Sequence, residues 1–327
     1  MAKASKKKAA KSGKAAKSGK ASKSDKALKS EKAPKSEKAA KSEHTSKTPS
    51  WSKPVTTVLQ ADGVKVRDLD TSATPGFQGD KRAGEQLLAE RSLLLSDLQE
   101  KLYANGRSGD TRNVLLVLQG MDTAGKGGIV RHVIGSVDPQ GVDHAAFGVP
   151  TAEEKKHHFL WRIRRQLPRA GQIGVFDRSH YEDVLVVRVH DLVAPEVWEK
   201  RYDEINKFEA KLVDSGTTVV KVAMFVSLEE QKRRLMERLE RTDKYWKFNP
   251  NDIDERAYWP AYQDAYQAVL DRTSTEYAPW HVLPCDHKWY SRLAVTELLI
   301  DALQGLKLDW PPANFDVEEQ KARLASA

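Results

Sequence analysis

The first group of residues that could do chemistry is a glycine-rich loop with one lysine. It reads Gly120-Met-Asp-Thr-Ala-Gly125-Lys126-Gly127-Gly128 and follows the pattern G-x-x-x-x-G-K. Glycines let consecutive backbone N–H groups turn towards phosphate oxygens, and the lysine adds a positive charge. An apolar run precedes the loop and a helical pattern follows it, which is the context that phosphate binding requires. We therefore predict that this loop binds phosphate; the alternative is a plain glycine turn with a solvated lysine.

Asp122 lies inside this loop, where a negative charge is unexpected. Most loops of this kind have Ser or Thr after the lysine, and its hydroxyl binds Mg²⁺, but here that position is Gly127. A carboxylate among phosphates is unfavourable unless a cation lies between them. We expect Asp122 to bind Mg²⁺; the alternative is an aspartate that only stabilises the turn.

A second group, Asp177-Arg178-Ser179-His180, follows the apolar run 173–176. An acid at the end of a buried strand beside the loop strand is placed to be a second carboxylate for the metal. The planar guanidinium of Arg178 suits a phosphoryl group. The alternative is a simple ion pair between Asp177 and Arg178. We expect His180 to position the loop rather than to take part in the reaction.

The third group is the arginine-rich stretch 229–248. Arg234, Arg238 and Arg241 follow one another at steps of four and three, so on a helix they share one face. Two interpretations stay open. The face is either solvated and paired with the glutamates of the same stretch, or it belongs to a helical lid that closes over phosphates.

Apolar runs and helical patterns alternate along residues 82–305. Strands buried on both faces are predicted at 114–118, 173–176, 219–226 and, more briefly, at "PWHVLP". Helices are predicted at 82–104, 127–136, 151–167, 195–215, 228–241, 254–274 and 287–305. This order predicts a three-layer α/β fold, with a parallel sheet covered by helices on both faces. Ligands of such sheets bind at the carboxyl ends of the strands, where the first two groups lie.

The chain ends and the charge distribution divide the protein into three parts. Residues 1–50 hold 16 lysines and four acids, a net charge of +12, so the remaining residues sum to about −4 in a chain whose total is +8. A six-residue unit such as KSEKAA repeats there, and we predict a disordered Lys/Ala/Ser-rich tail that either keeps the chain soluble or binds polyanions. A phosphate-binding domain at 51–310 and a C-terminal tail at 311–327 complete the prediction.

Several classes of protein are disfavoured by the composition. No stretch of about 18 apolar residues predicts a membrane span, and the N-terminus lacks the apolar core of a signal peptide. Cys285 is the single cysteine, so no intrachain disulfide forms, and we read it as a structural thiol. These features favour a cytoplasmic protein.

Five segments in this order resemble the polyphosphate kinase 2 family across most of residues 55–305. They read "LQGMDTAGKGG", "VDPQGV", "FLWRIRRQLPRAGQIGVFDRSHYEDVLVVRVH", "YDEINKFE" and "KYWKFNPND". The wording is most similar to class III of that family. The resemblance implies a P-loop kinase fold like that of thymidylate kinase, with a helical lid. It also implies reversible, Mg²⁺-dependent transfer of the terminal phosphoryl group of polyphosphate to AMP or ADP, with GDP as a further acceptor.

The resemblance also implies roles for individual residues. Asp122 and Asp177 would bind Mg²⁺, Lys126 and Arg178 would bind the phosphates at the transfer point, and Arg238 would reach in from the lid. Three more arginines are implied as phosphate contacts, namely Arg131, Arg233 and Arg234. The family suggests a homo-oligomer, either a dimer or a tetramer.

Two departures from the class III wording leave the preference between AMP and ADP open. Asp177 stands where many class III members have Asn, and Gly127-Gly128 stands where many have a pair that includes an acid. Other functions are also open at this level. The chain could be a nucleoside monophosphate kinase that uses ATP, a nucleic-acid-associated protein that acts through its basic tail, or an inactive phosphate-binding module.

Overall fold

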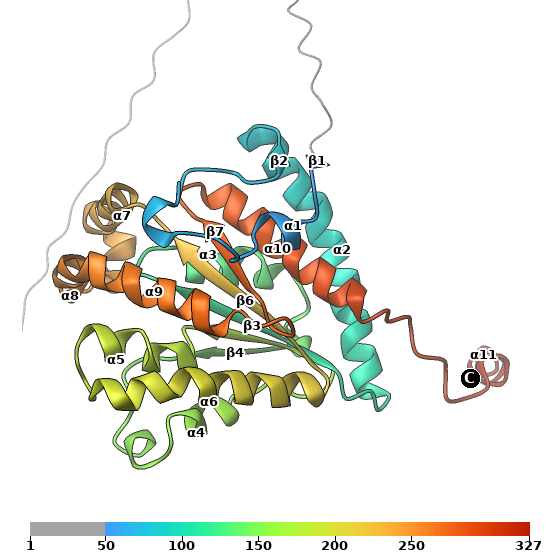
Figure 1. The fold of residues 1–327 in the computed structure, drawn as a ribbon. Coiled ribbons are helices and arrows are strands. Elements are labelled where there is room, and N and C mark those ends of the chain that lie inside the picture. Colours follow the sequence, from blue (N-terminus) through green and yellow to red (C-terminus); the bar gives the residue numbers. More distant parts are fainter. Residues whose placement is uncertain (1–49) are drawn as a thin grey trace, which may run out of the picture. The chain divides into compact units, whose positions relative to one another are not determined.

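A parallel sheet of five strands lies at the centre of the protein. The structure is a computed structural model, and it describes residues 50–327 (Figure 1). The strands are β3 (Asn113–Gly120), β4 (Val142–Ala146), β5 (Ile173–Asp177), β6 (Thr217–Phe225) and β7 (Trp280–Pro284). Their order across the sheet is β4-β5-β3-β6-β7, and every pair is parallel. All the carboxyl ends therefore meet at one edge.

Helices cover both faces of this sheet, as the sequence predicts. One face carries α1 (Val55–Val58), α2 (Lys81–Arg107), α3 (Lys126–His132) and α10 (Lys288–Gly305). The other carries α4 (Leu160–Arg164), α5 (Val186–Val189), α6 (Pro195–Asp214) and α9 (Trp259–Thr273). The predicted α/β architecture with a parallel sheet between two helical layers is thus confirmed.

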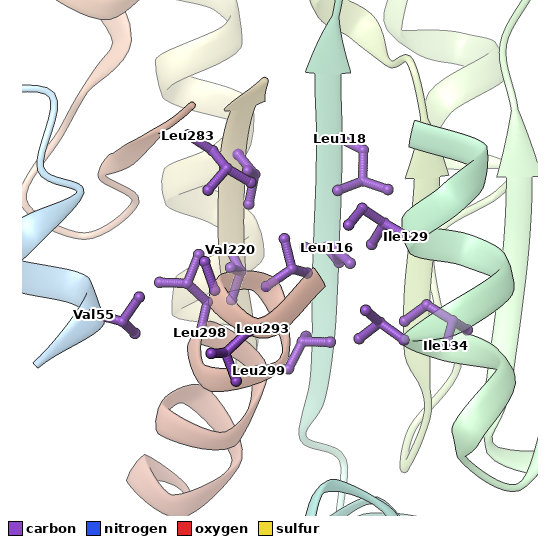
Figure 2. Close-up of a cluster of buried hydrophobic side chains, with 14 of the residues drawn as sticks. Val55, Leu116, Leu118, Ile129, Ile134, Val220, Leu283, Leu293, Leu298 and Leu299 are labelled. Carbon is purple, nitrogen blue, oxygen red and sulfur yellow. The ribbon is translucent and has the colours of Figure 1, made fainter. Parts of the chain in front are cut away.

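Strand β3 shows why the sheet forms here. All eight of its residues are buried, and successive side chains point to opposite faces. Leu116 and Leu118 join Val220 of β6 in the core beneath α3 and α10 (Figure 2). Leu115 and Val117 join the core beneath α6 and α9. A strand between two apolar cores needs a continuous apolar sequence, which is the pattern that revealed it.

Shorter elements complete the described residues. The 3₁₀ helices are η1 (Val66–Asp68), η2 (Ile134–Ser136), η3 (Pro139–Gly141), η4 (Glu154–Lys156), η5 (His180–Asp183), η6 (Thr242–Lys247) and η7 (Glu255–Tyr258). Strands β1 (Ser50–Trp51) and β2 (Phe77–Gln78) form an antiparallel pair. Helices α7 (Leu228–Glu240) and α8 (Asn251–Asp254) flank η6, and α11 (Val317–Ala325) follows residue 316. No helix among residues 50–327 is long and apolar enough to cross a membrane.

Three of the differences between the predicted and the observed elements have a clear physical cause. Strand β4 was not predicted, because its sequence VDHAA is half exposed at the edge of the sheet and forms no apolar run. The helix expected at 151–167 is wrong in extent: residues 151–158 offer no apolar stripe, and α4 is five residues long. The helix expected at 254–274 divides, since Pro260 lies in the first turn of α9, where proline favours a helix start.

The structure describes the C-terminal end of the chain but almost none of the predicted N-terminal tail. The predicted tail at 1–50 lies outside the described residues, except for Ser50. The predicted C-terminal tail at 311–327 contains α11, whose first turn is capped by the Asp316 side chain and which buries none of its residues.

Candidate active site

A cavity of about 640 Å³ opens where the strands end. It lies over the loop after β3, the end of β5 and the first turns of α3 and α10, and α7 and η6 form its outer side. Predicted site residues that border it are Asp122, Gly125, Lys126, Gly127, Gly128, Arg131, Asp177, Arg178, Arg234 and Arg238. The structure therefore gathers the loop, the second acid and part of the arginine-rich stretch around one space.

The loop needs glycine at two positions for two different reasons. Gly120 is packed so closely that an added Cβ would lie 2.6 Å from the Met224 carbonyl oxygen. Gly125 has a φ of 118°, in the left-handed region that favours glycine. At Gly127 and Gly128, by contrast, an added Cβ would meet nothing within 4 Å. These two glycines leave the start of α3 open, so that a ligand can approach its backbone N–H groups.

Lys126 is held inside the loop that it follows. Its side chain is 8% exposed, and Nζ donates hydrogen bonds to the carbonyl oxygens of Gly120 and Met121. The ammonium group thus lies against the loop backbone, and Lys126 borders the cavity. This is the placement expected of a lysine that neutralises phosphate.

Asp122 and Arg178 form an ion pair across the site. Arg178 Nη2 donates to Asp122 Oδ1 over 2.8 Å, and the two side chains are 37% and 31% exposed. Burial alone would raise the pKa of Asp122, but Lys126, Arg178 and Arg238 together lower it below its usual value. Asp122 is therefore a carboxylate held among cations. The alternative pairing of Arg178 with its neighbour Asp177 is wrong, because Arg178 reaches across to the loop after β3.

The backbone of Arg178 has an unusual conformation, which accompanies this direction of its side chain. Its φ is 64°, in the left-handed region, while its N–H donates to the Leu118 carbonyl of β3. A non-glycine residue in such a conformation costs about 1–3 kcal/mol and persists only where the surroundings hold it. Burial opposes the charge of Arg178, but Glu182 and Asp122 more than compensate, so its pKa is raised. Arg178 is a permanent cation aimed into the cavity.

Asp177 ends β5 opposite Leu118 and borders the same cavity as Asp122. Among residues 50–327 no group of three or more His, Cys, Asp or Glu side chains is placed to hold a metal ion. Mg²⁺ needs fewer protein ligands, because it binds through one or two carboxylates and completes its shell with water and substrate phosphates. The two half-buried carboxylates, which border the same cavity, fit that requirement.

The arginine-rich stretch separates into residues with different surroundings. Arg238 borders the cavity and donates to Asp252 Oδ2 and to the Lys247 carbonyl, each over 3.0 Å. Arg241 is half exposed and pairs with Glu237 and Asp243. Of the three arginines on the predicted helical face, Arg234 and Arg238 therefore border the cavity and Arg241 does not.

Two predicted phosphate contacts have other partners in the structure. Arg234 is 5% exposed, and its nitrogens donate to Glu230 and to carbonyl oxygens of the β3 loop and of the segment after β7. It clamps α7 to the phosphate loop. Arg233 is 59% exposed, pairs with Glu230 over 2.6 Å and lies outside the cavity lining. Arg234 thus borders the cavity while its nitrogens are engaged by Glu230 and by backbone carbonyls, and Arg233 lies outside the lining. Phosphate binding by either residue stays a prediction.

Basic side chains that the sequence did not point to line the cavity beside the predicted Arg131. Lys288 and Arg292 come from the first turns of α10, and His132 and Arg131 come from the end of α3. Burial and the nearby Arg292 and Arg131 lower the pKa of His132, and burial together with neighbouring arginines lowers the pKa of Lys288. The positive charges of Arg131, Lys288 and Arg292 repel one another, so this side of the cavity is suited to a polyanion. The helical spacing of Lys288 and Arg292 was the available signal.

A second cavity of about 260 Å³ adjoins the first and shares Asp122, Arg178 and Asp252 with it. Its other walls are less basic and include Glu182 and Tyr262. Burial raises the pKa of Glu182 above its usual value although Arg178 and a hydrogen bond from Gln119 oppose this. Further lining residues are Val149, Leu185, Val186, Asn249, Asn251 and Tyr266.

The family model described as "Polyphosphate kinase 2" matches residues 78–309. The chain belongs to the polyphosphate kinase 2 family. Its match extends from the end of β2 to just beyond α10, so it includes both cavities and the segment α7–η6. The prediction of this family from sequence is confirmed.

Relatives and solved structures agree with this assignment. The chain is 46% identical over 254 residues to the AMP/ADP-polyphosphate phosphotransferase of Meiothermus ruber, which covers 77% of this chain and 94% of that one. It is 41% identical over 266 residues to the ADP-polyphosphate phosphotransferase of Rhodopseudomonas palustris, covering 78% and 90%. The crystal structure of polyphosphate kinase 2 from Arthrobacter aurescens TC1 matches with a TM-score of 0.83 and 51% identity, over 85% of this chain and 99% of that chain. The predicted P-loop kinase fold is confirmed.

Proposed function

We propose that this polyphosphate kinase 2 transfers a phosphoryl group, reversibly, between inorganic polyphosphate and a nucleoside mono- or diphosphate. The observation that carries the proposal is the ion pair Asp122–Arg178, which both cavities share. One cavity is large and lined by cations, and the other is smaller and lined by acidic, amide and aromatic side chains. A phosphoryl group that passes between two substrates must cross a boundary of this kind.

The larger cavity suits the polyphosphate chain. A donor with a negative charge on every phosphate gains from cations along its whole length. Helix α3 rises about 1.5 Å per residue, so Arg131 and His132 lie roughly 8–9 Å along the helix from Lys126. Together with Arg292 they support a path along which several phosphates bind beyond the transfer point.

The smaller cavity suits the nucleotide. Tyrosine rings and aliphatic side chains offer surfaces for a base and a ribose, while Asn and Glu side chains offer hydrogen bonds to their polar edges. The relative from Meiothermus ruber is named for both AMP and ADP, which supports both as acceptors here. GDP remains a further candidate acceptor.

Catalysis in this proposal rests on positioning and on charge. Lys126 and Arg178 bind the phosphates at the transfer point, and Arg238 adds charge from α7 when the lid segment closes. Asp122 and Asp177 would hold Mg²⁺, which when bound neutralises phosphate charge and orients the phosphate oxygens. Phosphoryl transfer of this kind does not demand a separate general base, because an acceptor phosphate is already a nucleophile.

A matrix of donors and acceptors tests the proposal. Purified full-length protein with Mg²⁺ receives polyphosphate or ATP as donor and AMP, ADP, GDP or dTMP as acceptor, and chromatography identifies the products. We expect ADP and ATP from polyphosphate with AMP, and ATP from polyphosphate with ADP. Transfer from ATP alone, with polyphosphate inert, would replace the proposal with an ATP-dependent nucleoside monophosphate kinase. Replacing Mg²⁺ with excess EDTA should abolish turnover.

Chain length provides a sharper test of the cationic path. The variants Arg131→Gln and Arg292→Gln should raise the KM for long polyphosphate more than the KM for short oligophosphates. Arg241→Gln is the matched control, because Arg241 pairs at the surface outside the cavity lining. Equal effects on long and short donors would contradict a path beyond the transfer point.

A further inference from the structure

A fully buried ion pair lies behind the loop that carries Arg178. Glu209 of α6 and Lys221 of β6 are 0% exposed, and Lys221 Nζ lies 2.6 Å from Glu209 Oε2. Lys221 also donates to the Thr273 carbonyl at the end of α9 over 2.7 Å. Two charges removed from water are poor stabilisers, because the loss of hydration offsets much of their attraction. Their presence at this place therefore calls for a reason other than stability.

The pair is bound directly to η5, which follows Arg178 in the chain. Tyr181 Oη donates to Glu209 Oε1 over 2.7 Å and accepts from Lys221 Nζ over 3.0 Å. Burial and the nearby Glu209 raise the pKa of Tyr181 well above its usual value, which keeps the hydroxyl as a donor. His180 Nε2 lies 3.1 Å from the same carboxylate oxygen. Since a carboxylate only accepts hydrogen bonds, this nitrogen carries a proton and donates it.

His180 makes no second polar contact. Its Nδ1 is buried without a hydrogen-bond partner, and its ring packs against Tyr181 and Phe208 at centroid distances of 4.6 and 5.5 Å. The ring borders neither substrate cavity. Its one hydrogen bond therefore serves to fix where the start of η5 lies.

The segment between β5 and this anchor has little freedom. Arg178 begins it with a φ of 64° and a hydrogen bond to β3. Ser179 Oγ donates to Gln119 Oε1 over 3.0 Å and accepts from the Tyr181 N–H over 3.2 Å. Strand pairing thus holds one side of Arg178 and the buried anchor holds the other. A left-handed arginine between two fixed points keeps its direction towards Asp122.

We infer that His180 and Tyr181 are positioning residues that tie Arg178 to the buried Glu209–Lys221 pair and so aim its guanidinium at the transfer point. The inference rests on the proposed function, because the proposed function places Arg178 at the phosphates. None of these buried groups touches substrate, and no proton of the network enters the reaction. The ion pair supplies a rigid acceptor and donor at one place, which apolar side chains of the same volume could not.

Two variants of His180 separate the hydrogen bond from packing. In His180→Gln the amide nitrogen reaches the place of Nε2 and donates to Glu209, whereas His180→Leu fills the space without a donor. We expect His180→Leu to lower kcat about 10- to 100-fold, since small displacements of a catalytic group have effects of this size. The KM values for polyphosphate and nucleotide should change less than about threefold, and His180→Gln should keep most of the wild-type kcat.

A double-mutant cycle with Arg178→Lys tests whether the effect passes through Arg178. The lysine lacks the planar fork, so there is no aimed guanidinium left to displace, and His180→Leu should then change kcat less than about threefold. All four proteins are assayed well below their unfolding temperatures, and the folded fraction is measured by circular dichroism.

Two results would overturn the inference. One is an equal effect of His180→Leu in both backgrounds, and the other is a loss of activity that matches the unfolded fraction in both His180 variants. The cycle compares variants with one another, whereas the donor matrix on wild-type protein decides the proposed function. A failure of the inference about His180 is therefore distinguishable from a failure of the proposed function.

Discussion

Two ion pairs in this protein combine the same kinds of group in opposite surroundings. Asp122–Arg178 lies at the boundary of two cavities, with its side chains about a third exposed. Glu209–Lys221 lies behind the same loop and is 0% exposed. The first pair can exchange its partners for phosphate, metal or water. The second cannot, because each of its members would be left as an uncompensated charge in the interior.

The surroundings also explain how each pair is used. Around Asp122, cations from several elements face a space that a ligand can enter, and their mutual repulsion is relieved when an anion binds. Burial alone would raise the pKa of Glu209, but Lys221 and His180 lower it, so this carboxylate stays charged as a fixed acceptor. A catalytic group needs accessible charge, whereas an anchor needs charge that water cannot reach.

The largest expected effect separates activity from stability at the open pair. Asp122→Asn should lower kcat/KM by about 10³-fold or more, because the site loses a charged ligand and the partner of Arg178. Its unfolding temperature should change little, since both side chains are in partial contact with solvent. Steady-state kinetics and thermal unfolding measure the two quantities. Asp264→Asn, at an exposed pair with Arg67, is the control, and more than a tenth of wild-type activity in Asp122→Asn would contradict the assignment.

The next effect is on stability at the closed pair. Lys221→Met leaves Glu209 buried and unpaired, so the free energy of unfolding should fall by about 3–5 kcal/mol. The double variant Glu209→Leu with Lys221→Met should lose less than this single variant, because it leaves no buried charge. Urea unfolding followed by circular dichroism measures both. A single variant as stable as the wild type would break the contrast between the pairs.

A pair of intermediate exposure tests the role of solvent. The hydrogen bonds and charges of Arg233 and Arg234 outweigh burial and lower the pKa of Glu230 to about 2. A lowered folded pKa gives stability that is complete above the ordinary value of 4.5 and is lost as the pH falls towards 2. Glu230→Gln should cost about 1–2 kcal/mol at pH 7, less than the full shift implies because the group is partly solvated. Unfolding between pH 5 and pH 2, on the order of this window, should then depend less on pH than in the wild type.

The smallest effect has the opposite sign. Burial raises the pKa of Glu182, so its ionised form is unfavourable in the folded protein at pH 7. Glu182→Gln should therefore give a small increase in the free energy of unfolding at pH values above the ordinary glutamate pKa and have little effect below it. The kcat/KM for the nucleotide should fall, because Glu182 lines the smaller cavity. If stability fell equally at pH 7 and at acidic pH, the carboxyl group would instead be a structural acceptor.

Sequence reasoning was most successful where the signal was local. The glycine pattern identified the loop with Asp122 and Lys126, and the apolar run before Asp177 and Arg178 identified the second acid. Both groups follow buried strands of a parallel sheet, so the rule that strand ends meet at one edge was enough to bring them together. The family assignment followed from the same segments.

Sequence reasoning was least informative where a residue's partners come from distant parts of the chain. Arg234 has the same type and spacing as Arg238, yet it is buried against carbonyl oxygens of two other loops. Lys288 and Arg292 begin a helix far along the chain, and only the packing of α10 beside α3 brings them to the phosphate loop. Strand β4 gave no apolar signal because an edge strand need not be buried on both sides.

The amino-acid sequence by itself predicted four of the five sheet strands, the longer helices, the phosphate loop and the two strand-end acids, because these depend on periodicity and on neighbours within a few residues. Tertiary structure decided which arginines face the cavity, which carboxylate pairs with Arg178 and where the buried pair anchors the loop. Those choices depend on contacts between segments 29 to 111 residues apart, such as His180 with Glu209 and Arg234 with Thr123. Burial then sets the strength of each charge, and burial is a property of the folded protein alone.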